Sequence, residues 1–317
     1  MCRRLKQREI LDSQISMSDV KEITRLNDIA SCQRYLKYML DFYFDAIEFP
    51  RNSDSRMLLD ANLWLQTIFT KGCAFLDLLN GIKYEKPGVR LNTILDPSLL
   101  FTIARRIYES VVDFNMLYIY PETQQQKDIL YNLFMAAGLS ERLKNWNEDM
   151  RSKYPERVQE EEKDIQDCKT AIENNELWSS LRTQTQQVIY NAIESHKFRY
   201  KFNSGNVLCP VKWKNAYELL RVKKDIYESM YSFLSLHSHP SYLALIQFRD
   251  AYIPDIRQDV QMAIHTTQCV LSFMSIFIVD YMKLFPNLKT HFEKLELPKQ
   301  FLIGMYEDVM RGEKKYK

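Results

Sequence analysis

The stretch DPSLLFTIARRIYESVVDFNMLYIYP, residues 96–121, decides the class of fold. Pro97 is tolerated in the first turn of a helix and Pro121 cannot continue one, so the two prolines set the limits of a predicted helix. Within these limits apolar side chains recur at spacings of three and four and cover nearly every side of the helix. They are Leu100, Ile103, Ile107, Val111, Phe114 and Tyr118 on one face, and Val112, Met116 and Ile119 on the other.

A narrow charged stripe interrupts this apolar coat. It consists of Arg106, Glu109 and Asp113, which share one side of the helix. Each charge needs a partner, because removing an unpaired charge from water costs several kcal/mol. One interpretation is a single internal salt-bridge network that orients neighbouring helices. The other is a functional site in which Arg106 stabilises negative charge, such as that on a phosphoryl oxygen.

Composition extends the helical pattern to the rest of the chain. The 317 residues include 7 glycines and 10 prolines, whereas sheets need many turns and turns consume these residues. We therefore predict an all-α protein, a multi-helix bundle with long antiparallel helices and a charged helical arm. Apolar spacing predicts further helices over residues 18–49, 55–80, 177–196, 213–236 and 254–285.

The domain organisation follows from the same reading. We predict a flexible N-terminal segment over residues 1–17, one helical domain over residues 18–312 and a frayed C-terminus over residues 313–317. The segment 82–95 is predicted to be a loop, because Pro87 and Gly88 form a turn signal within it.

The charged helical arm, about residues 155–176, has a different texture. Most of its residues are charged, and its apolar residues Val158, Ile165 and Ile172 lie seven apart. This is a thin apolar seam on a solvated helix. One interpretation is an exposed helix that lies on its own domain, because three apolar positions are too few for a coiled coil that stands alone. The alternative is a homodimer contact through residues 156–176.

Net charge gives no general support to a nucleic-acid partner, because it is only +2. Basic and aromatic residues alternate over residues 197–202, and further lysines and an arginine follow over residues 212–224. Such a mixture can stack bases and neutralise phosphates, which makes these two segments a candidate RNA surface. The alternative is a half-buried strand or loop with a solvated edge.

The cysteines and the most apolar segment bear on compartment and cofactors. Six cysteines lie far apart, none in a CxxC pair, so no metal site and no cofactor is indicated. Residues 269–279 are the most apolar stretch, yet a bilayer span takes about 20 residues. We therefore expect no membrane segment and, with no signal peptide in view, a cytoplasmic location.

A second polar segment ends the helix predicted over residues 213–236. Ser235, His237 and His239 gather there, and Pro240 enforces the break. A histidine at a helix C-terminus holds its proton more readily and can act as general acid or base when a partner fixes its tautomer. The alternative is structural: these histidines bond the last helix carbonyls, and His237 with His239 is an incomplete metal pair.

Two segments together resemble a bacterial all-α family of unknown function. One is Ala104-Arg105-Arg106-Ile107-Tyr108-Glu109-Ser110, an R-x-x-E element. The other is Tyr231-x-x-Leu234-Ser235-x-x-x-His239-Pro240-Ser241. That family is distantly similar to the HEPN group, which includes RNA-cleaving toxins and phage-defence proteins. The resemblance implies a site with Arg106, Glu109 and His239, and with Asp113, Ser235 and His237 as further candidates.

This sequence departs from the HEPN pattern at one point. The HEPN nucleases carry an arginine four to six residues before a histidine, and here no arginine precedes His237 or His239 at that distance. A metal-independent RNA-directed enzyme would therefore need Arg106 to arrive from another helix. The alternative function is a non-catalytic helical binding module in which the Arg, Glu and His residues are structural. A ligand pocket lined by Tyr and Met residues between bundle helices is a further hypothesis.

Overall fold

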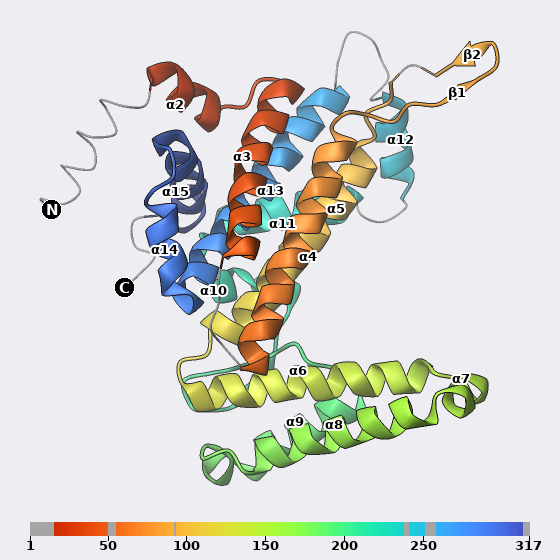
Figure 1. The fold of residues 1–317 in the computed structure, drawn as a ribbon, viewed down its shortest axis with the longest axis vertical. Helices are drawn as coiled ribbons and strands as arrows, with labels where there is room; N and C mark the ends of the chain where they lie inside the picture. Colours follow the sequence, from red (N-terminus) through yellow and green to blue (C-terminus); the bar gives the residue numbers. More distant parts are fainter. Residues whose placement is uncertain (1–15, 50–54, 92, 238–240, 251–257, 313–317) are drawn as a thin grey trace, which may run out of the picture. The chain divides into compact units, whose positions relative to one another are not determined.

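The computed structural model describes residues 16–49, 55–91, 93–237, 241–250 and 258–312. These residues form 14 α-helices, α2 to α15, and two short hairpins (Figure 1). The prediction of an all-α multi-helix bundle is confirmed. The chain divides into two compact units, Met1–Val112 with Leu220–Lys317, and Asp113–Leu219. Residues 18–312, predicted to be one domain, span both of these units, and their status as a single domain stays a prediction. The predicted flexible ends, residues 1–17 and 313–317, lie almost entirely outside the described residues.

The first unit is built from the two ends of the chain. Its elements are α2 (Met17–Thr24), α3 (Ile29–Glu48), α4 (Arg56–Leu78), β1 (Glu85–Lys86), β2 (Val89–Arg90), most of α5 (Pro97–Phe114), α11 (Lys224–His237), α12 (Tyr242–Asp250), α13 (Gln258–Leu284), α14 (Pro286–Phe292) and α15 (Leu297–Arg311). In Figure 1, α3 and α13 run beside each other, as do α3 and α4. Strands β1 and β2 form an antiparallel hairpin around Pro87 and Gly88.

Helix α13 is the core of this unit. Most of its 27 residues are buried, including polar ones such as Thr267 and Ser275. It packs against α3, α4, α14 and α15. By length and composition α13 is apolar enough to cross a membrane, but 78% of its apolar window is buried inside the fold, as in the core helix of a soluble protein.

A glycine lets α4 approach its neighbours closely. A Cβ atom added at Gly72 would lie 2.7 Å from Leu40 Cδ2 and 3.3 Å from Met274 Cε, closer than side chains ordinarily pack. The missing side chain therefore brings the backbone of α4 against α3 and α13. The helix predicted over residues 55–80 is confirmed with small changes at its ends, since α4 spans Arg56–Leu78.

The helix predicted over residues 18–49 is interrupted. Helix α2 ends at Thr24, and α3 begins at Ile29 behind a capping box in which the Asp28 carboxylate accepts from the Ser31 N–H at 2.7 Å and the Ser31 hydroxyl oxygen accepts from the Asp28 N–H at 3.3 Å. This pair satisfies two backbone donors at once and fixes a new helix start inside the apolar pattern.

The second unit, Asp113–Leu219, is built around two long helices. Its elements are a π-helical turn η1 (Asn115–Ile119), α6 (Gln124–Asn145), α7 (Glu148–Lys153), α8 (Pro155–Glu173), η2 (Trp178–Ser180), α9 (Thr183–Glu194), β3 (Tyr200–Phe202), β4 (Leu208–Pro210), η3 (Trp213–Asn215) and α10 (Tyr217–Leu220), whose last residue begins the other unit. Helices α6 and α8 lie side by side (Figure 1).

The charged arm corresponds to α8. Ile172 is buried and Val158 and Ile165 are half-buried, and this side of the helix lies on α6. Glu161 is also buried, and its charge is compensated because Arg142 of α6 and Arg157 of α8 both bind its carboxylate. The arrangement corresponds to the interpretation of a helix that lies on its own fold.

The long helix predicted over residues 213–236 is wrong. The segment forms η3, α10 and α11, with a break at Arg221, whose backbone has a φ of 54°. Helix α15 supplies the reason. The Leu220 carbonyl accepts from Arg311 Nε at 2.9 Å, and the Lys223 N–H donates to the Met310 carbonyl at 2.8 Å. These bonds replace the helical bonds that a continuous helix would need.

Candidate functional site

The charged stripe of α5 is centred on Glu109. Its two carboxylate oxygens accept from two arginines, Arg105 Nε at 3.0 Å and Arg106 Nη1 at 3.2 Å. The side chains of Arg105 and Glu109 are 16% and 15% exposed, whereas that of Arg106 is 70% exposed. Arg105, which the sequence interpretation did not place in the stripe, is therefore the inner partner of Glu109, and Arg106 carries the charge that faces solvent.

Asp113 belongs to a different ion pair. Arg199 binds it with two hydrogen bonds, Nε to Oδ1 at 2.8 Å and Nη2 to Oδ2 at 2.9 Å. The guanidinium also lies over the rings of Phe198 and Trp213, at 4.8 and 4.6 Å from the ring centroids. This geometry combines a bidentate carboxylate pair with two cation–π contacts. The residues of the stripe therefore belong to two ion-pair groups. Asp113 stabilises the second unit, and Glu109 pairs with arginines in the first unit.

The candidate RNA surface is partly neutralised in the same way. Residues 197–202 enter β3, which pairs antiparallel with β4, as the half-buried strand interpretation predicts. Arg199 is bound to Asp113, and the Lys201 ammonium is bound to Glu218. Lys201 also lies over the Tyr120 ring at 5.4 Å. Within residues 212–224, Lys224 lies 3.8 Å from Glu228.

A tyrosine cluster joins α5 to α11 within the first unit. The buried hydroxyl groups of Tyr108 and Tyr227 form a hydrogen bond, and the Tyr227 ring stacks on Tyr231 with an interplanar angle of 7°. The Arg105 guanidinium lies over the Tyr231 ring at 5.9 Å. Burial raises the pKa of both Tyr108 and Tyr227. The R-x-x-E element and the first residue of the second element thus meet in the fold.

The remaining predicted site residues lie at or beyond the end of α11. Ser235 is half-buried on α11, and His237 is the last residue of that helix. His239 lies outside the described residues. Its approach to Glu109 stays a prediction. Among the residues that the structure describes, no group of three or more His, Cys, Asp or Glu residues could hold a metal ion.

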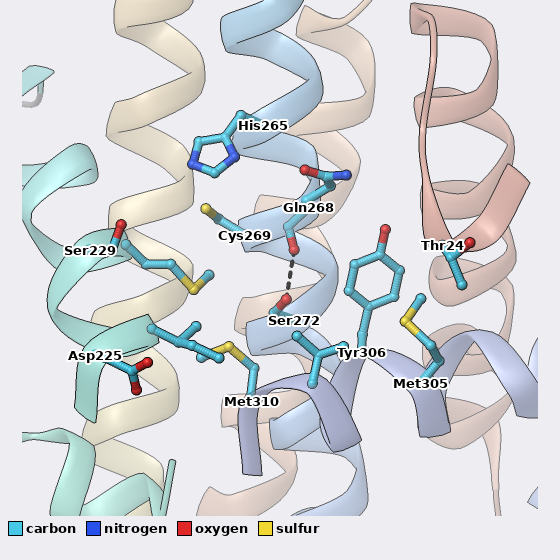
Figure 2. Close-up of a pocket in the computed structure, with 13 residues that line it drawn as sticks. Thr24, Asp225, Ser229, His265, Gln268, Cys269, Ser272, Met305, Tyr306 and Met310 are labelled. Atoms are coloured by element: carbon cyan, nitrogen blue, oxygen red, sulfur yellow. Dashed lines mark hydrogen bonds between the residues drawn. The ribbon is translucent and has the colours of Figure 1, made fainter. Parts of the chain in front are cut away.

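A pocket of about 490 Å³ opens in the first unit, between α11, α13 and α15, with Thr24 of α2 at its edge (Figure 2). Its volume is in the range of small-molecule sites, which are typically about 300–1,000 Å³. Figure 2 shows sulfur atoms around the cavity. The lining residues are Thr24, Asp225, Ile226, Ser229, Met230, His265, Gln268, Cys269, Ser272, Met305, Tyr306, Val309 and Met310.

The pocket has an apolar floor and a polar rim. Met230, Cys269, Tyr306 and Met310 are buried, whereas Thr24, Asp225, Ser229 and His265 are exposed. We call the former the methionine floor. Flexible thioethers adapt to ligands of irregular shape, which makes such a floor permissive. The lining includes Tyr306 and three methionines, Met230, Met305 and Met310, but the hypothesis of a ligand pocket between bundle helices stays a prediction. No local sequence signal could have given its location, because three helices that lie far apart in the sequence form it.

The pKa values of two pocket residues are shifted, one in the floor and one on the rim. Burial raises the pKa of the Cys269 thiol to about 12, so this cysteine stays protonated and unreactive at neutral pH. Partial burial lowers the pKa of His265, whose ring packs edge-to-face on Phe233 at 4.5 Å. The Ser272 hydroxyl donates to the Gln268 carbonyl of its own helix at 2.8 Å (Figure 2). The pocket therefore presents hydroxyl, amide and imidazole groups, together with the side chain of Asp225, above an apolar surface.

The comparisons with known proteins give one match. The sequence model of a family described as "Family of unknown function (DUF5677)" matches residues 96–251. The chain is similar to that family over α5 to α12, a segment that contains both sequence elements quoted above. No curated protein matches the chain. No solved structure matches it either.

Proposed function

We propose that this protein is a non-catalytic helical binding module whose ligand is an apolar small molecule held on the methionine floor. The pocket itself carries the proposal, because it is large enough for such a ligand and lies between helices of one compact unit. Its buried lining is mainly apolar, while its rim offers hydroxyl, amide, imidazole and carboxyl groups to a polar end of the ligand.

The charged stripe supports the same proposal. Glu109 is bound by two arginines and Asp113 by a third, so both carboxylates already have cationic partners. A general base must be able to reach a proton of the substrate. Carboxylates that are ion-paired with arginines in this way are better suited to orienting side chains than to accepting a proton from a substrate.

The test is binding of N-phenyl-1-naphthylamine, an uncharged apolar probe that fluoresces in apolar surroundings. Ser229→Trp places a large side chain at the rim, and we expect it to weaken binding at least tenfold. Ser232→Trp is the matched control, because Ser232 is exposed on the same helix and does not line the pocket. Failure of the unmodified protein to bind the probe, or equal binding by both variants, would contradict the proposal.

The second candidate function is a HEPN-like, metal-independent, RNA-directed reaction in bacterial defence or stress response. Arg106 is mostly exposed while its position is fixed by Glu109, and this observation favours a cation available to a phosphate. His239 would be the acid or base, with Ser235 and His237 as further contributors, whereas Asp113 pairs with Arg199 in the second unit. Purified protein is incubated with total RNA beside the Arg106→Gln and His239→Ala variants. Equal cleavage by all three proteins would contradict this candidate.

We also propose a cytoplasmic location. Five cysteines, Cys32, Cys73, Cys168, Cys209 and Cys269, are free thiols, and free thiols persist in a reducing compartment. Fractionation of cells that produce the protein, followed by thiol labelling, tests this. Recovery of the protein outside the cytoplasmic fraction would contradict it.

A further inference from the structure

The rim of the pocket above the methionine floor carries a carboxylate. Asp225 lies in the first turn of α11 and Ser229 follows it one turn later, so both side chains lie on the side of α11 that lines the pocket. In Figure 2, Asp225 lies at the lower end of the pocket, and His265 and Gln268 lie at its upper end. Among the described residues that line the pocket, Asp225 is the only Asp, Glu, Lys or Arg.

The other titratable groups of the lining add no positive charge. Partial burial lowers the pKa of His265, so its imidazole is neutral at pH 7.5. Burial keeps the thiol of Cys269 and the hydroxyl of Tyr306 protonated, because it raises the pKa of both. The remaining polar groups of the lining are neutral hydroxyls and one amide. The pocket therefore combines an apolar floor with a single negative charge at its rim.

The two lysines that precede Asp225 in the chain do not pair with it. The Lys223 ammonium donates to the Val309 carbonyl at 3.1 Å, and Lys224 lies 3.8 Å from Glu228. Neither lysine lines the pocket. Within the described part of the chain, the Asp225 carboxylate has no ion-pair partner. A cation that enters the pocket therefore does not have to displace a lysine or an arginine from this carboxylate.

We propose that the ligand of this pocket is a protonated apolar amine, whose ammonium group binds Asp225 and whose hydrocarbon part lies on the methionine floor. The inference rests on the proposed function, because it takes the same pocket and names the class of ligand. An ammonium group donates charge-assisted hydrogen bonds to a carboxylate, and the Ser229 hydroxyl can accept a further N–H. The floor supplies most of the affinity, since an exposed ion pair contributes little by itself. Asp225 supplies the selection, because it attracts a cation and repels a carboxylic acid of the same shape.

The first arm of the test compares three ligands of one shape. They are 4-phenylbutylamine, 4-phenylbutan-1-ol and 4-phenylbutyrate, which are a cation, a neutral molecule and an anion at pH 7.5. Each is titrated into the full-length protein by calorimetry at low ionic strength. We expect the amine to bind about fivefold more tightly than the alcohol, and the acid to bind more weakly than the alcohol. Added salt should reduce the preference for the amine, because the rim is exposed and its charge is screened.

The second arm assigns the preference to Asp225. In the Asp225→Asn variant, which keeps the shape and removes the charge, the ratio of amine to alcohol affinity should fall to about one. Glu228→Gln is the matched control, because it removes an exposed carboxylate of the same helix that does not line the pocket. This variant should keep the preference for the amine. An acidic residue in the first turn also stabilises a helix, so thermal unfolding of both variants is measured, but a purely structural role would not change the ratio.

The neutral ligands separate this inference from the proposed function. A protein that binds N-phenyl-1-naphthylamine and the alcohol, but binds the amine no more tightly than the alcohol, overturns this inference and leaves the proposed function in place. A protein that binds none of these ligands overturns both. A preference for the amine that the Asp225→Asn variant retains also overturns this inference, because another group would then bind the ammonium.

Discussion

Arg311 is bound to Asp280 by two hydrogen bonds in the interior of the first unit, one from Nη1 to Oδ1 at 3.0 Å and one from Nη2 to Oδ2. Neither side chain is more than 2% exposed. Asp280 also binds Lys283 at 2.6 Å, and Arg311 binds Glu307 at 3.2 Å. The same guanidinium donates to the Leu220 carbonyl, so one residue near the end of α15 holds α13 and the α10–α11 junction together.

We expect Arg311→Met to lower the free energy of unfolding by about 3–5 kcal/mol, because it leaves Asp280 buried without its main partner. Urea unfolding followed by circular dichroism measures the change. Arg34→Met is the control, since the Arg34–Glu22 pair is largely exposed and such pairs contribute about 0–1 kcal/mol. A loss for Arg311→Met no larger than that of the control would contradict the role given to this network.

The buried tyrosines predict a loss of stability at alkaline pH. Burial raises the pKa of Tyr108, Tyr227 and Tyr306, so these hydroxyls stay protonated in the fold at pH values where the unfolded chain ionises. Their contribution is complete below the unfolded pKa of about 10 and is lost as the pH rises above that value. We expect the midpoint of urea unfolding to fall steeply above pH 10.

A substitution isolates the tyrosine contribution. Tyr227→Phe should reduce the slope of stability against pH above pH 10, while Tyr84→Phe, at an exposed position, should leave the slope as it is. Stability that stays constant between pH 9 and pH 11 would contradict the prediction.

The ion pairs on α5 predict unequal effects for two neighbouring positions. Glu109→Gln removes the carboxylate from Arg105, which is largely buried, and we expect a loss of about 1–3 kcal/mol in the free energy of unfolding. Arg106→Gln should cost less than about 1 kcal/mol, because its side chain is mostly exposed. Chemical unfolding of both variants measures the difference, and equal losses would contradict the division of Glu109 between an inner and an outer arginine.

Local patterns were enough to predict the class of fold. Apolar spacing and the prolines set the limits of α4 and α5 to within a few residues, because helices are encoded by neighbours in the chain. The same pattern failed over residues 213–236. The break at Arg221 depends on Arg311 and Met310, which lie far away in sequence and supply hydrogen bonds that no local pattern reveals.

The candidate site shows the same division. The charged stripe was visible in the sequence, but its partners were not: Asp113 pairs with Arg199, 86 residues away, and Glu109 takes Arg105 from its own helix. The charge pattern marked the residues that need partners, and only the fold could assign them. The sequence suggested only that a pocket lies between helices and gave no location for it. The reason is that α11, α13 and α15 each contribute two or more lining residues from distant parts of the chain.

Lys71 gives the last prediction, which concerns its chemical reactivity. Burial and the charge of Arg106 lower its pKa, so a larger fraction of its side chain is a free amine near pH 8 than for an ordinary lysine. The free amine is the nucleophile. We therefore expect trace acetic anhydride to acetylate Lys71 readily at pH 8 although Lys71 is half-buried. Mass spectrometry measures the rate at Lys71, with the exposed Lys83 as the internal reference. Arg106→Gln removes the repulsion, so it should slow the reaction at Lys71 and leave that at Lys83 unchanged. Faster acetylation of Lys71 in that variant would show that Arg106 blocks access to Lys71 and does not lower its pKa.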